Sequence, residues 1–361
     1  MTKTSLQIFI IGILTYALTA CDWANEFIEG LTAEKDANEM VKLTLAVAPH
    51  IAWMPWFLAE EDGVFQSNTD IYNVNIQFVT DTYHNTINKF INEEVHAIAI
   101  TNIDAIAQLV RRDVEADAIL ITNYSNGNEA ILLPTETDPN ILKIRGKKFA
   151  LVEFSSRHYL LDRFLVRNQI PFEDVKIHNT SEPDIPELLI EDQVYGVVTS
   201  NPNLDRLVQE NHAKILFDSR QIPNEIMDLI VVRREILHDH PNFAQALLGS
   251  WFSVMERLQG NQQGATLDDM ARLADISREN FERQMDTISL NDTPIKALSA
   301  IRDRRMRKTM RHIRYFIERH QLTSDEPFIN WVSYPGRTPA VLHFNGQPLQ
   351  DFVAPPRADN L

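Results

Sequence analysis

Polar and aromatic side chains follow several predicted β-strands in this sequence, at the points where the strands end. The segment PHIAWMPW at 49–56 follows the strand-like run 41–48, and its Trp53 and Trp56 offer flat apolar walls for a small ligand. The predicted ligand contacts are Trp53, Met54, Asp81, Tyr83, Thr101, Asn102, Ser155, Ser156, His158, Thr199, Asn201, Glu225 and Asp228. Their hydroxyl, amide, imidazole and carboxyl groups are suited to hold a small polar molecule by hydrogen bonds.

These candidates also have structural interpretations. Trp53 and Trp56 are equally suited to core packing, and structural ion pairs would account for the carboxylates. Ser155 or Ser156 can serve as the N-cap of a helix, which would turn the free amides of the helix N-terminus toward the ligand. The capping role is therefore compatible with binding.

The sequence lacks the signatures of the common catalytic sites. It has no glycine-rich phosphate loop, no nucleophile elbow and no paired metal-binding histidines on one helix face. Asp239, between His238 and His240, is better explained as part of a surface turn than as a metal ligand. We therefore expect a binding protein and not an enzyme, with no cofactor and no metal.

Alternating strand and helix patterns predict the elements that must position these side chains. Strand-like runs lie at 41–48, 74–79, 95–101, 118–122, 148–153, 175–179, 194–199 and 215–217, with helical patterns between them. Strands that alternate with helices form doubly wound, mostly parallel sheets that bind ligands at the carboxyl ends of their strands. The sequence thus predicts an α/β fold with two such lobes and flanking helices, in which the last strand, 227–233, returns to the first lobe.

The predicted boundaries follow from the same patterns. Lobe 1 is discontinuous, at 41–124 and 225–320, lobe 2 spans 125–224, and 321–361 form a C-terminal wrapping extension. The segment NYSNGN at 123–128 suits a hinge between the lobes. Helices are expected at 243–258, at 267–273 behind a cap at Thr266, and at 281–288 behind Ser277. The basic run RDRRMRK at 302–308 is interpreted as a solvated helix face, with a partner or anionic-lipid patch as the alternative.

Composition limits the class of protein further. The chain has 361 residues, of which 44% are hydrophobic, so it can form two globular domains of roughly 100–200 residues each. Fifty acidic against 34 basic residues give a net charge of −16, which repels nucleic acids. The single cysteine, Cys21, excludes an intramolecular disulfide and a cysteine-rich zinc site.

The N-terminus has the pattern of an export signal. Its apolar run at 6–18 is shorter than the about 20 residues that a membrane-spanning helix needs. The string LTAC at 18–21 resembles the bacterial lipobox. This resemblance implies that a signal peptide 1–20 is removed and that Cys21 carries the lipid. An ordinary secretory signal with a chance cysteine is the alternative.

A lipidated chain of this kind would be anchored to a membrane. Residues 21–40 would form the tether, and Asp22 resembles the signal that keeps enterobacterial lipoproteins at the inner membrane. We expect the protein in the bacterial periplasm or at the cell surface, held by the lipid alone.

Several strings resemble one family, the substrate-binding proteins of ABC importers for nitrate, sulfonate, taurine and bicarbonate. They are AWMPW at 52–56, TNIDA at 101–105, SNGNEAIL at 125–132, SSRHYLL at 155–161, TSNP at 199–202, FDSRQIPNEIMDLIVV at 217–232 and GSWFSVM at 249–255. The resemblance covers about 42–352 and is closest to a branch associated with urea carboxylase. It implies a two-lobed type II periplasmic-binding-protein fold that closes on a small solute and delivers it to an ABC permease with its ATPase. We expect a monomer.

Two other functions stay open on the same scaffold. A ligand-sensing lipoprotein would report to a membrane partner instead of feeding a permease. The related pyrimidine synthases of thiamin biosynthesis depend on a cysteine-rich motif that this chain does not have.

The charges near the predicted cleft bear on the solute. Relatives commonly carry Trp in the motif that reads TSNP here, so an aromatic wall is missing at Ser200. A sulfonate or nitrate needs donors and positive potential, urea needs donors and carbonyls, and a guanidinium needs a carboxylate. The candidate charges are Asp81, Asp104, Glu153, Glu225 and Asp228 against Arg157 and His158. They favour a urea-like or guanidine-like nitrogen compound, with sulfonate, taurine or nitrate as the alternative.

Overall fold

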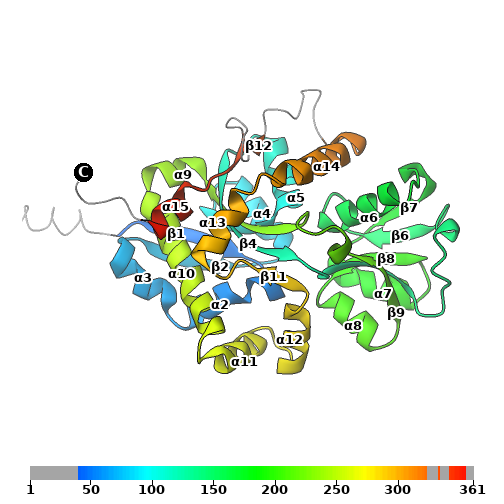
Figure 1. The fold of residues 1–361 in the computed structure, drawn as a ribbon, viewed down its shortest axis with the longest axis horizontal. Coiled ribbons are helices and arrows are strands. Elements are labelled where there is room, and N and C mark those ends of the chain that lie inside the picture. Colours follow the sequence, from blue (N-terminus) through cyan, green and yellow to red (C-terminus); the bar gives the residue numbers. More distant parts are fainter. Residues whose placement is uncertain (1–39, 323–331, 334–340, 355–361) are drawn as a thin grey trace, which may run out of the picture. The chain divides into compact units, whose positions relative to one another are not determined.

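Two mostly parallel β-sheets form the framework of the chain (Figure 1). The structure is a computed structural model that describes residues 40–322, 332–333 and 341–354. Lys42–Leu361 form one compact unit. The predicted signal peptide 1–20, Cys21 and the tether up to residue 39 lie outside the described residues, as do 323–331, 334–340 and 355–361 of the predicted extension.

The larger sheet has eight strands among the described residues, in the order β12-β13-β4-β10-β3-β1-β2, with β11 also paired to β4. They are β1 (Lys42–Val47), β2 (Asn75–Thr80), β3 (Ala97–Thr101), β4 (Ala116–Ser125), β10 (Met227–Arg233), β11 (Ile288–Leu290), β12 (Val332–Ser333) and β13 (Leu342–Phe344). All strands except β10 and β11 run in the same direction. As predicted, β10 returns to this sheet, where it lies between β3 and β4.

The smaller sheet has the strand order β7-β6-β8-β5-β9. Its strands are β5 (Glu129–Pro134), β6 (Lys148–Leu151), β7 (Lys176–Asn179), β8 (Gly196–Ser200) and β9 (Ala213–Asp218). Only β5 is antiparallel to its neighbours. We call the larger sheet with its helices lobe 1 and the smaller sheet with its helices lobe 2. The predicted α/β fold with two mostly parallel sheets and flanking helices is confirmed.

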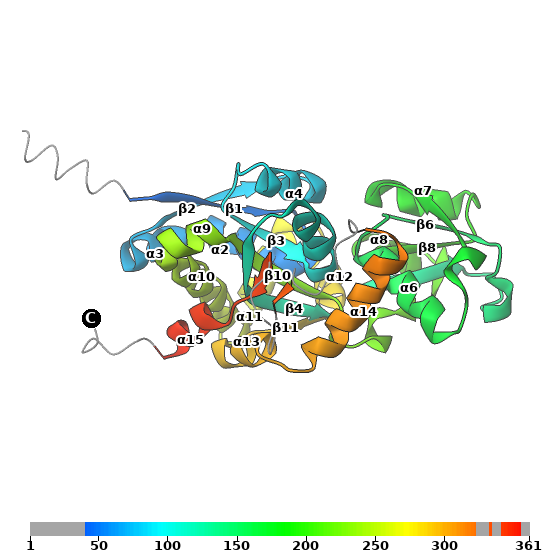
Figure 2. The ribbon, with the colours of Figure 1, turned by 90° about the horizontal axis from the view of Figure 1, so that it is seen from above.

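Helices flank both sheets. In lobe 1 they are η1 (Ile51–Trp53), α2 (Met54–Glu61), α3 (Val64–Tyr72), α4 (Tyr83–Ile91), α5 (Asn102–Asp104), η2 (Ala105–Leu109), η3 (Val110–Arg112), α9 (Arg234–Asp239), α10 (Pro241–Gln259), α11 (Gln263–Leu273), α12 (Arg278–Met285), α13 (Pro294–Ile301), α14 (Met306–Arg319) and α15 (Gln347–Val353). In lobe 2 they are η4 (Ile141–Lys143), α6 (Ser156–Arg167), η5 (Phe172–Asp174), η6 (Glu182–Asp184), α7 (Ile185–Ile190), α8 (Asn203–Gln209) and η7 (Ser219–Gln221). Helix α14 lies beside α6 of lobe 2 (Figure 2).

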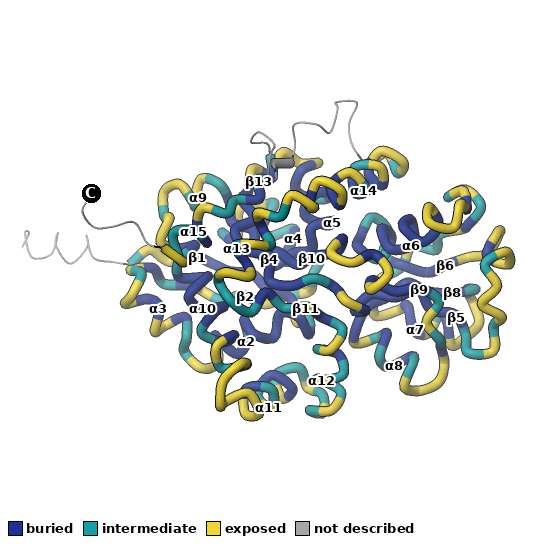
Figure 3. Tube along the Cα trace, in the orientation of Figure 1, coloured by how far each residue is buried: buried dark blue, intermediate teal, exposed yellow. Residues whose placement is uncertain are grey.

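The core explains why these segments fold as they do. Strand β3 is buried at every residue, and β4 at all but one, because helices cover both faces of the sheet. Helix α10 packs against α2, where the rings of Trp56 and Trp251 lie 5.2 Å apart. Exposed residues are confined mainly to outer helix faces and connections (Figure 3).

The chain passes between the lobes twice near the site. Residues 126–128 join β4 to β5, and 219–226 join β9 to β10. The first connection is shorter than the predicted hinge at 123–128, because β4 continues through Ser125 to pair with β10 and β11. Strand β5 had no counterpart in the sequence prediction.

Of the two predicted helix caps, Thr266 was wrong and Ser277 was confirmed. Helix α11 begins at Gln263, and the Thr266 hydroxyl donates to the carbonyl of Gln262 at 2.9 Å instead of capping the helix. Ser277 does cap α12, but that helix spans Arg278–Met285 and the chain then enters β11. The mixed pattern around Ile288 belongs to this short strand, which pairs with β4.

Candidate functional site

Arg157 stands at the centre of a polar cluster between the two sheets. It is the second residue of α6, whose N-cap Ser155 accepts a hydrogen bond from the Arg157 backbone N–H at 3.2 Å. Its guanidinium donates from Nη2 to Ser200 Oγ at 2.6 Å and from Nη1 to Ser156 Oγ at 3.1 Å. Only 11% of the side chain is exposed. A buried cation of this kind requires opposite charges close by.

The first of these charges is Glu182, at the start of η6 in lobe 2. Its Oε2 atom lies 3.4 Å from Arg157 Nε. Its Oε1 atom accepts hydrogen bonds from the Ser200 backbone N–H at 3.2 Å and from the Thr199 hydroxyl. The end of β8 therefore holds Glu182 against the guanidinium.

Lobe 1 supplies the opposing carboxyl group of Asp104. The Tyr83 hydroxyl donates to Asp104 Oδ2 at 2.9 Å and accepts from the Thr101 backbone N–H at 3.0 Å. The Thr101 hydroxyl donates to the same carboxylate oxygen at 2.7 Å. Burial raises the pKa of Asp104, and the Thr101 hydrogen bond and the Arg157 charge oppose the rise. The positive charge of Arg157, in lobe 2, thus acts on a carboxyl group of lobe 1.

The Tyr83 ring beside this carboxyl group packs in a row with two further aromatic rings of lobe 1. The ring of Trp53 lies 5.4 Å from that of Tyr83 and 5.2 Å from that of His50. Nδ1 of His50 accepts from the Ala52 backbone N–H at 3.3 Å. Burial, together with the Arg157 charge, lowers the pKa of His50 to about 3, so its ring is neutral and carries its proton on Nε2.

Asp228 and Glu129 complete the set of carboxyl groups. Asn123 Nδ2 donates to Asp228 Oδ2 at 3.0 Å, and the Ser125 hydroxyl donates to Glu129. Burial and the Glu129 charge raise the pKa of Asp228 to about 7. Burial also raises the pKa of Glu129, and the Arg157 charge opposes that rise.

We call Asp104, Glu129, Glu182, Asp228 and Arg157 the Arg157 cluster. Four carboxyl groups surround one guanidinium, so the cluster carries an excess of negative charge once they ionise. Four buried polar atoms in or near it have no hydrogen-bond partner, namely Trp53 Nε1, Asn128 Oδ1, Arg157 Nε and Glu182 Oε2. Since buried polar atoms are normally hydrogen-bonded, these atoms mark groups that a ligand would engage. The cluster offers both donors and acceptors.

Several residues predicted from the sequence lie at this cluster. They are Trp53, Tyr83, Thr101, Ser155, Ser156, Thr199 and Asp228. Met54 is buried at the start of α2. Asn102 ties β3 to the second connection, since its amide donates to the Glu225 carbonyl at 3.0 Å and accepts from the Met227 N–H at 3.2 Å. Asn201 donates to Thr287 Oγ1 of lobe 1 at 3.0 Å and so joins the lobes.

Three other predicted contacts face different surroundings. Asp81 pairs with Lys89 at 2.7 Å on the surface. His158 is buried on the other side of α6, where its ring lies 4.3 Å from that of His320, because successive helix residues are about 100° apart. Burial, together with His320, lowers the pKa of His158 to about 3.

Glu225 likewise belongs to a separate group of ion pairs. Its carboxylate accepts from Arg163 Nε at 2.6 Å and from the Tyr159 hydroxyl at 2.7 Å, and lies 3.0 Å from His312 Nδ1. Burial would raise the pKa of Glu225, but the hydrogen bonds from Arg163 and Tyr159 lower it overall. This carboxylate fastens the second connection to α6 and α14.

Three carboxyl groups of the cluster were not among the predicted contacts, and of these only Asp104 was among the candidate charges. Glu129 starts β5, the strand that the sequence pattern did not predict, and Glu182 lies in a polar stretch beyond β7. Glu129 had one usable signal, since a carboxyl group opens the apolar run EAILLP. Glu182 had none, because its approach to Arg157 depends on the pairing of β8.

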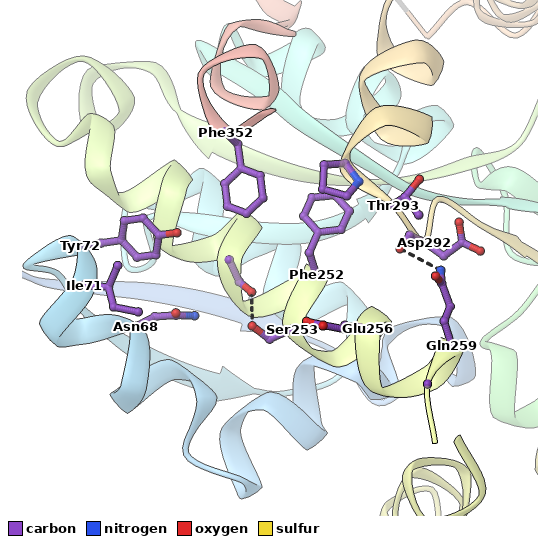
Figure 4. A pocket seen from close by; sticks show the side chains of 13 residues that line it. Asn68, Ile71, Tyr72, Phe252, Ser253, Glu256, Gln259, Asp292, Thr293 and Phe352 are labelled. Carbon is purple, nitrogen blue, oxygen red and sulfur yellow. Dashed lines mark hydrogen bonds between the residues drawn. The ribbon is translucent and has the colours of Figure 1, made fainter. Parts of the chain in front are cut away.

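A pocket lies elsewhere, in lobe 1. It has a volume of about 660 Å³ and lies among α3, α10, α15 and the residues that follow β11. Figure 4 shows Tyr72, Phe252 and Phe352 around it, with Gln259 donating to the Asp292 carbonyl at 3.1 Å. No residue of its lining is among the described residues that have a buried, unpartnered polar atom. The Arg157 cluster is therefore the stronger candidate for a ligand site.

Metal sites and membrane-spanning helices are two further features that would indicate function. Within 40–322, 332–333 and 341–354, no three acidic, histidine or cysteine side chains are grouped so as to bind a metal ion. No helix in that part of the chain is both long and apolar enough to cross a bilayer.

Comparison with known proteins places the fold. The sequence profile of the NMT1-like family matches residues 36–274. No curated protein sequence shows a significant match. Solved structures with the same fold include the aliphatic sulphonate-binding protein SsuA of Escherichia coli, with 14% identity, a TM-score of 0.64 and coverage of 78% of this chain and 88% of that one.

Two further structures are similar. The alkanesulfonate-binding protein SsuA of Xanthomonas axonopodis pv. citri, bound to MOPS, has 14% identity and a TM-score of 0.62, over 79% of this chain and 95% of that one. The nitrate-binding protein NrtA of Synechocystis PCC 6803 has 12% identity and a TM-score of 0.53, over 67% and 69%.

Proposed function

This chain belongs to the NMT1-like family, and we propose that it is the solute-binding component of an ABC importer, with the Arg157 cluster as its ligand site. The observation that carries the proposal is the position of the cluster between two lobes. Arg157 and Glu182 come from lobe 2, and Asp104, Asp228 and Trp53 come from lobe 1. The similar SsuA and NrtA proteins are described as sulfonate-binding and nitrate-binding.

The distribution of the ligand-binding side chains over both lobes explains how a solute would be captured. A solute touches groups of both lobes only when the lobes meet, so its binding energy shifts the chain toward the closed arrangement. The connections 126–128 and 219–226 are short enough to act as hinges. The proposed partners are the permease and ATPase subunits that receive the solute.

We favour a small nitrogen compound that carries several N–H donors, such as a guanidinium or amidinium ion, with urea as the neutral analogue. Glu182 forms the only ion pair with the arginine of the cluster, and among the described residues no ion pair joins Asp104, Glu129 or Asp228 to a cation. A planar cation with N–H donors would pair with these carboxylates. A sulfonate or nitrate is the alternative, because Arg157, Trp53 Nε1 and His50 Nε2 are donors.

The N-terminal proposal concerns residues outside the structure. We propose that Cys21 is lipidated and that the protein works in the periplasm or at the cell surface, as a monomer. Mass spectrometry of the N-terminal peptide tests this, since a lipobox predicts a mature chain that begins at a diacylglycerol-modified Cys21. An unmodified N-terminus at another residue would contradict it.

The solute proposal is tested by thermal unfolding of the chain from Asp22 onward with millimolar methylguanidinium, acetamidinium, urea, taurine, methanesulfonate or nitrate. A ligand at 100 times its Kd adds about 2.7 kcal/mol and raises the Tm by several degrees. We expect stabilisation by the two cations, at matched ionic strength. Stabilisation by the sulfonates alone would contradict the nitrogen-compound proposal and leave the importer role intact.

A further inference from the structure

The basic segment 302–314 differs in charge from the rest of this acidic chain. It contains seven Lys or Arg residues and one Asp, so it carries a charge of +6 while the remainder carries −22. The segment includes the end of the α13–α14 connection and the first turns of α14. The solute site uses none of these residues.

Most of the basic side chains of this segment have no counter-charge. Within the residues that the structure describes, no ion pair joins Arg302, Arg304, Arg307, Lys308 or Arg311 to a carboxylate. Arg305 pairs with Asp303, and Arg314 with Glu318. By contrast, arginines elsewhere commonly form ion pairs, as Arg233, Arg272 and Arg283 do. The segment thus holds a local concentration of unpaired cations.

Helix α14 displays them on a single face. Its apolar side chains Met306, Met310, Ile313, Phe316 and Ile317 are buried against the body. Arg307, Lys308 and Arg311 are exposed on the opposite face of the helix, together with Tyr315, which is 47% exposed, and Arg304 is exposed in the connection just before the helix. We call these five residues the basic face. The guanidinium of Arg314 lies 5.1 Å from the Tyr315 ring centroid.

We propose that the basic face is a docking surface for an anionic lipid bilayer. Exposed arginines and lysines beside an aromatic ring on an amphipathic helix are the groups that bind acidic headgroups and the interfacial region. The rest of the chain carries a net charge of −22 and is repelled by an anionic surface, so approach within a Debye length of about 10 Å is favoured with the basic face toward the bilayer. The proposed anchor at Cys21 would keep the body near the membrane, since the 20 residues from 22 to 41 span up to about 70 Å.

Vesicle flotation of the unlipidated chain from Asp22 to Leu361, which contains the compact unit Lys42–Leu361, tests the proposal. The probes are phosphatidylcholine vesicles with and without about 30 mol% phosphatidylglycerol, at about 0.05 M and 0.5 M NaCl. We expect binding to the anionic vesicles at low salt only. Arg304→Glu/Arg307→Glu/Arg311→Glu should weaken that binding by at least about tenfold.

The matched control is Arg111→Glu/Arg112→Glu/Lys176→Glu, which changes the net charge equally at other exposed positions. It should retain most of the binding, and both variants should keep the wild-type Tm. Equal loss in the two triple variants would overturn the proposal, as would binding to both vesicle types or to neither. Absence of vesicle binding would point to an acidic protein partner instead. The assay contains no solute, so its outcome is independent of the proposed solute function.

Discussion

Arg157 Nε lies 3.4 Å from Glu182 Oε2, and neither atom completes a hydrogen bond with the other or with any described residue. Both residues belong to lobe 2, so this ion pair is already present before lobe 1 contributes its carboxyl groups. A carboxylate of its own lobe thereby offsets the positive charge of Arg157. Asp104 and Asp228 of lobe 1 and Glu129 of lobe 2 then create the negative potential on which the proposed solute preference depends.

The raised pKa of Asp228 predicts how the stability of the empty protein depends on pH. Its pKa is about 7 in the fold and about 3.9 in an unfolded chain. The folded protein therefore holds a proton that the unfolded chain loses between pH 4 and 7, so the free energy of unfolding falls as the pH rises through this window, by at most about 4 kcal/mol.

Asp228→Asn should remove this part of the pH dependence and make the protein more stable than wild type at pH 8. Urea unfolding at pH 5 and pH 8 measures the effect. Asp81→Asn is the control, because Asp81 is a surface carboxylate paired with Lys89. An unchanged pH slope in Asp228→Asn would show that Asp228 ionises normally.

Trp53→Phe should weaken solute binding with little effect on the fold. Trp53 is only 3% exposed and packs against Tyr83 and His50, so removal of the whole ring would also destabilise lobe 1. Phenylalanine keeps much of the packing and removes the buried indole N–H, whose interaction with Asp228 opposes the rise in the pKa of that carboxyl group. We expect a severalfold loss of affinity for the strongest hit of the thermal screen, at a Tm within a few degrees of wild type. Unchanged affinity would assign Trp53 to the core alone.

A bidentate ion pair across the lobes should set the balance between open and closed arrangements. Arg283 of α12 donates to Asp205 of α8 at 2.7 Å and 2.8 Å. Arg283→Ala should increase the radius of gyration of the solute-free chain in X-ray scattering and weaken binding severalfold. Arg278→Ala is the control on the same helix, since Arg278 pairs with Asp268 and Glu282 within lobe 1. Equal effects of the two variants would contradict the interlobe role.

Glu225→Gln should lower stability without changing solute affinity. The substitution leaves the Arg163 guanidinium, which is 10% exposed, without its carboxylate partner. Breaking a buried ion pair in this way costs about 3–5 kcal/mol, which chemical unfolding would detect. Glu235→Gln is the control, because Glu235 pairs with Arg233 but is 52% exposed. A loss of affinity in Glu225→Gln at full stability would instead make Glu225 a ligand contact.

The alternation of strand and helix patterns predicted most strands of the two sheets, because apolar runs such as 227–233 must be buried on both faces, but it did not predict β5. Strand ends also predicted Thr101 and Ser156, since the carboxyl ends of parallel strands meet at one edge, and Asp228 reaches the same edge because it lies at the start of the antiparallel strand β10. The sequence pattern could not predict which strands and connecting segments lie next to one another. Whether a polar residue beside a strand faces Arg157, as Glu182 does, or another partner, as Glu225 does, depends on contacts between segments far apart in sequence.

Calorimetric titration of methylguanidinium into the wild type and Glu129→Gln at pH 8 tests the central claim most directly. Glu187→Gln is the matched control, because Glu187 is an exposed carboxylate of lobe 2 that pairs with Arg206. The account predicts that Glu129→Gln binds the cation at least about tenfold more weakly than wild type, with Glu187→Gln unchanged. Equal affinity in all three proteins, or tight binding of methanesulfonate by the wild type in place of the cation, would contradict it.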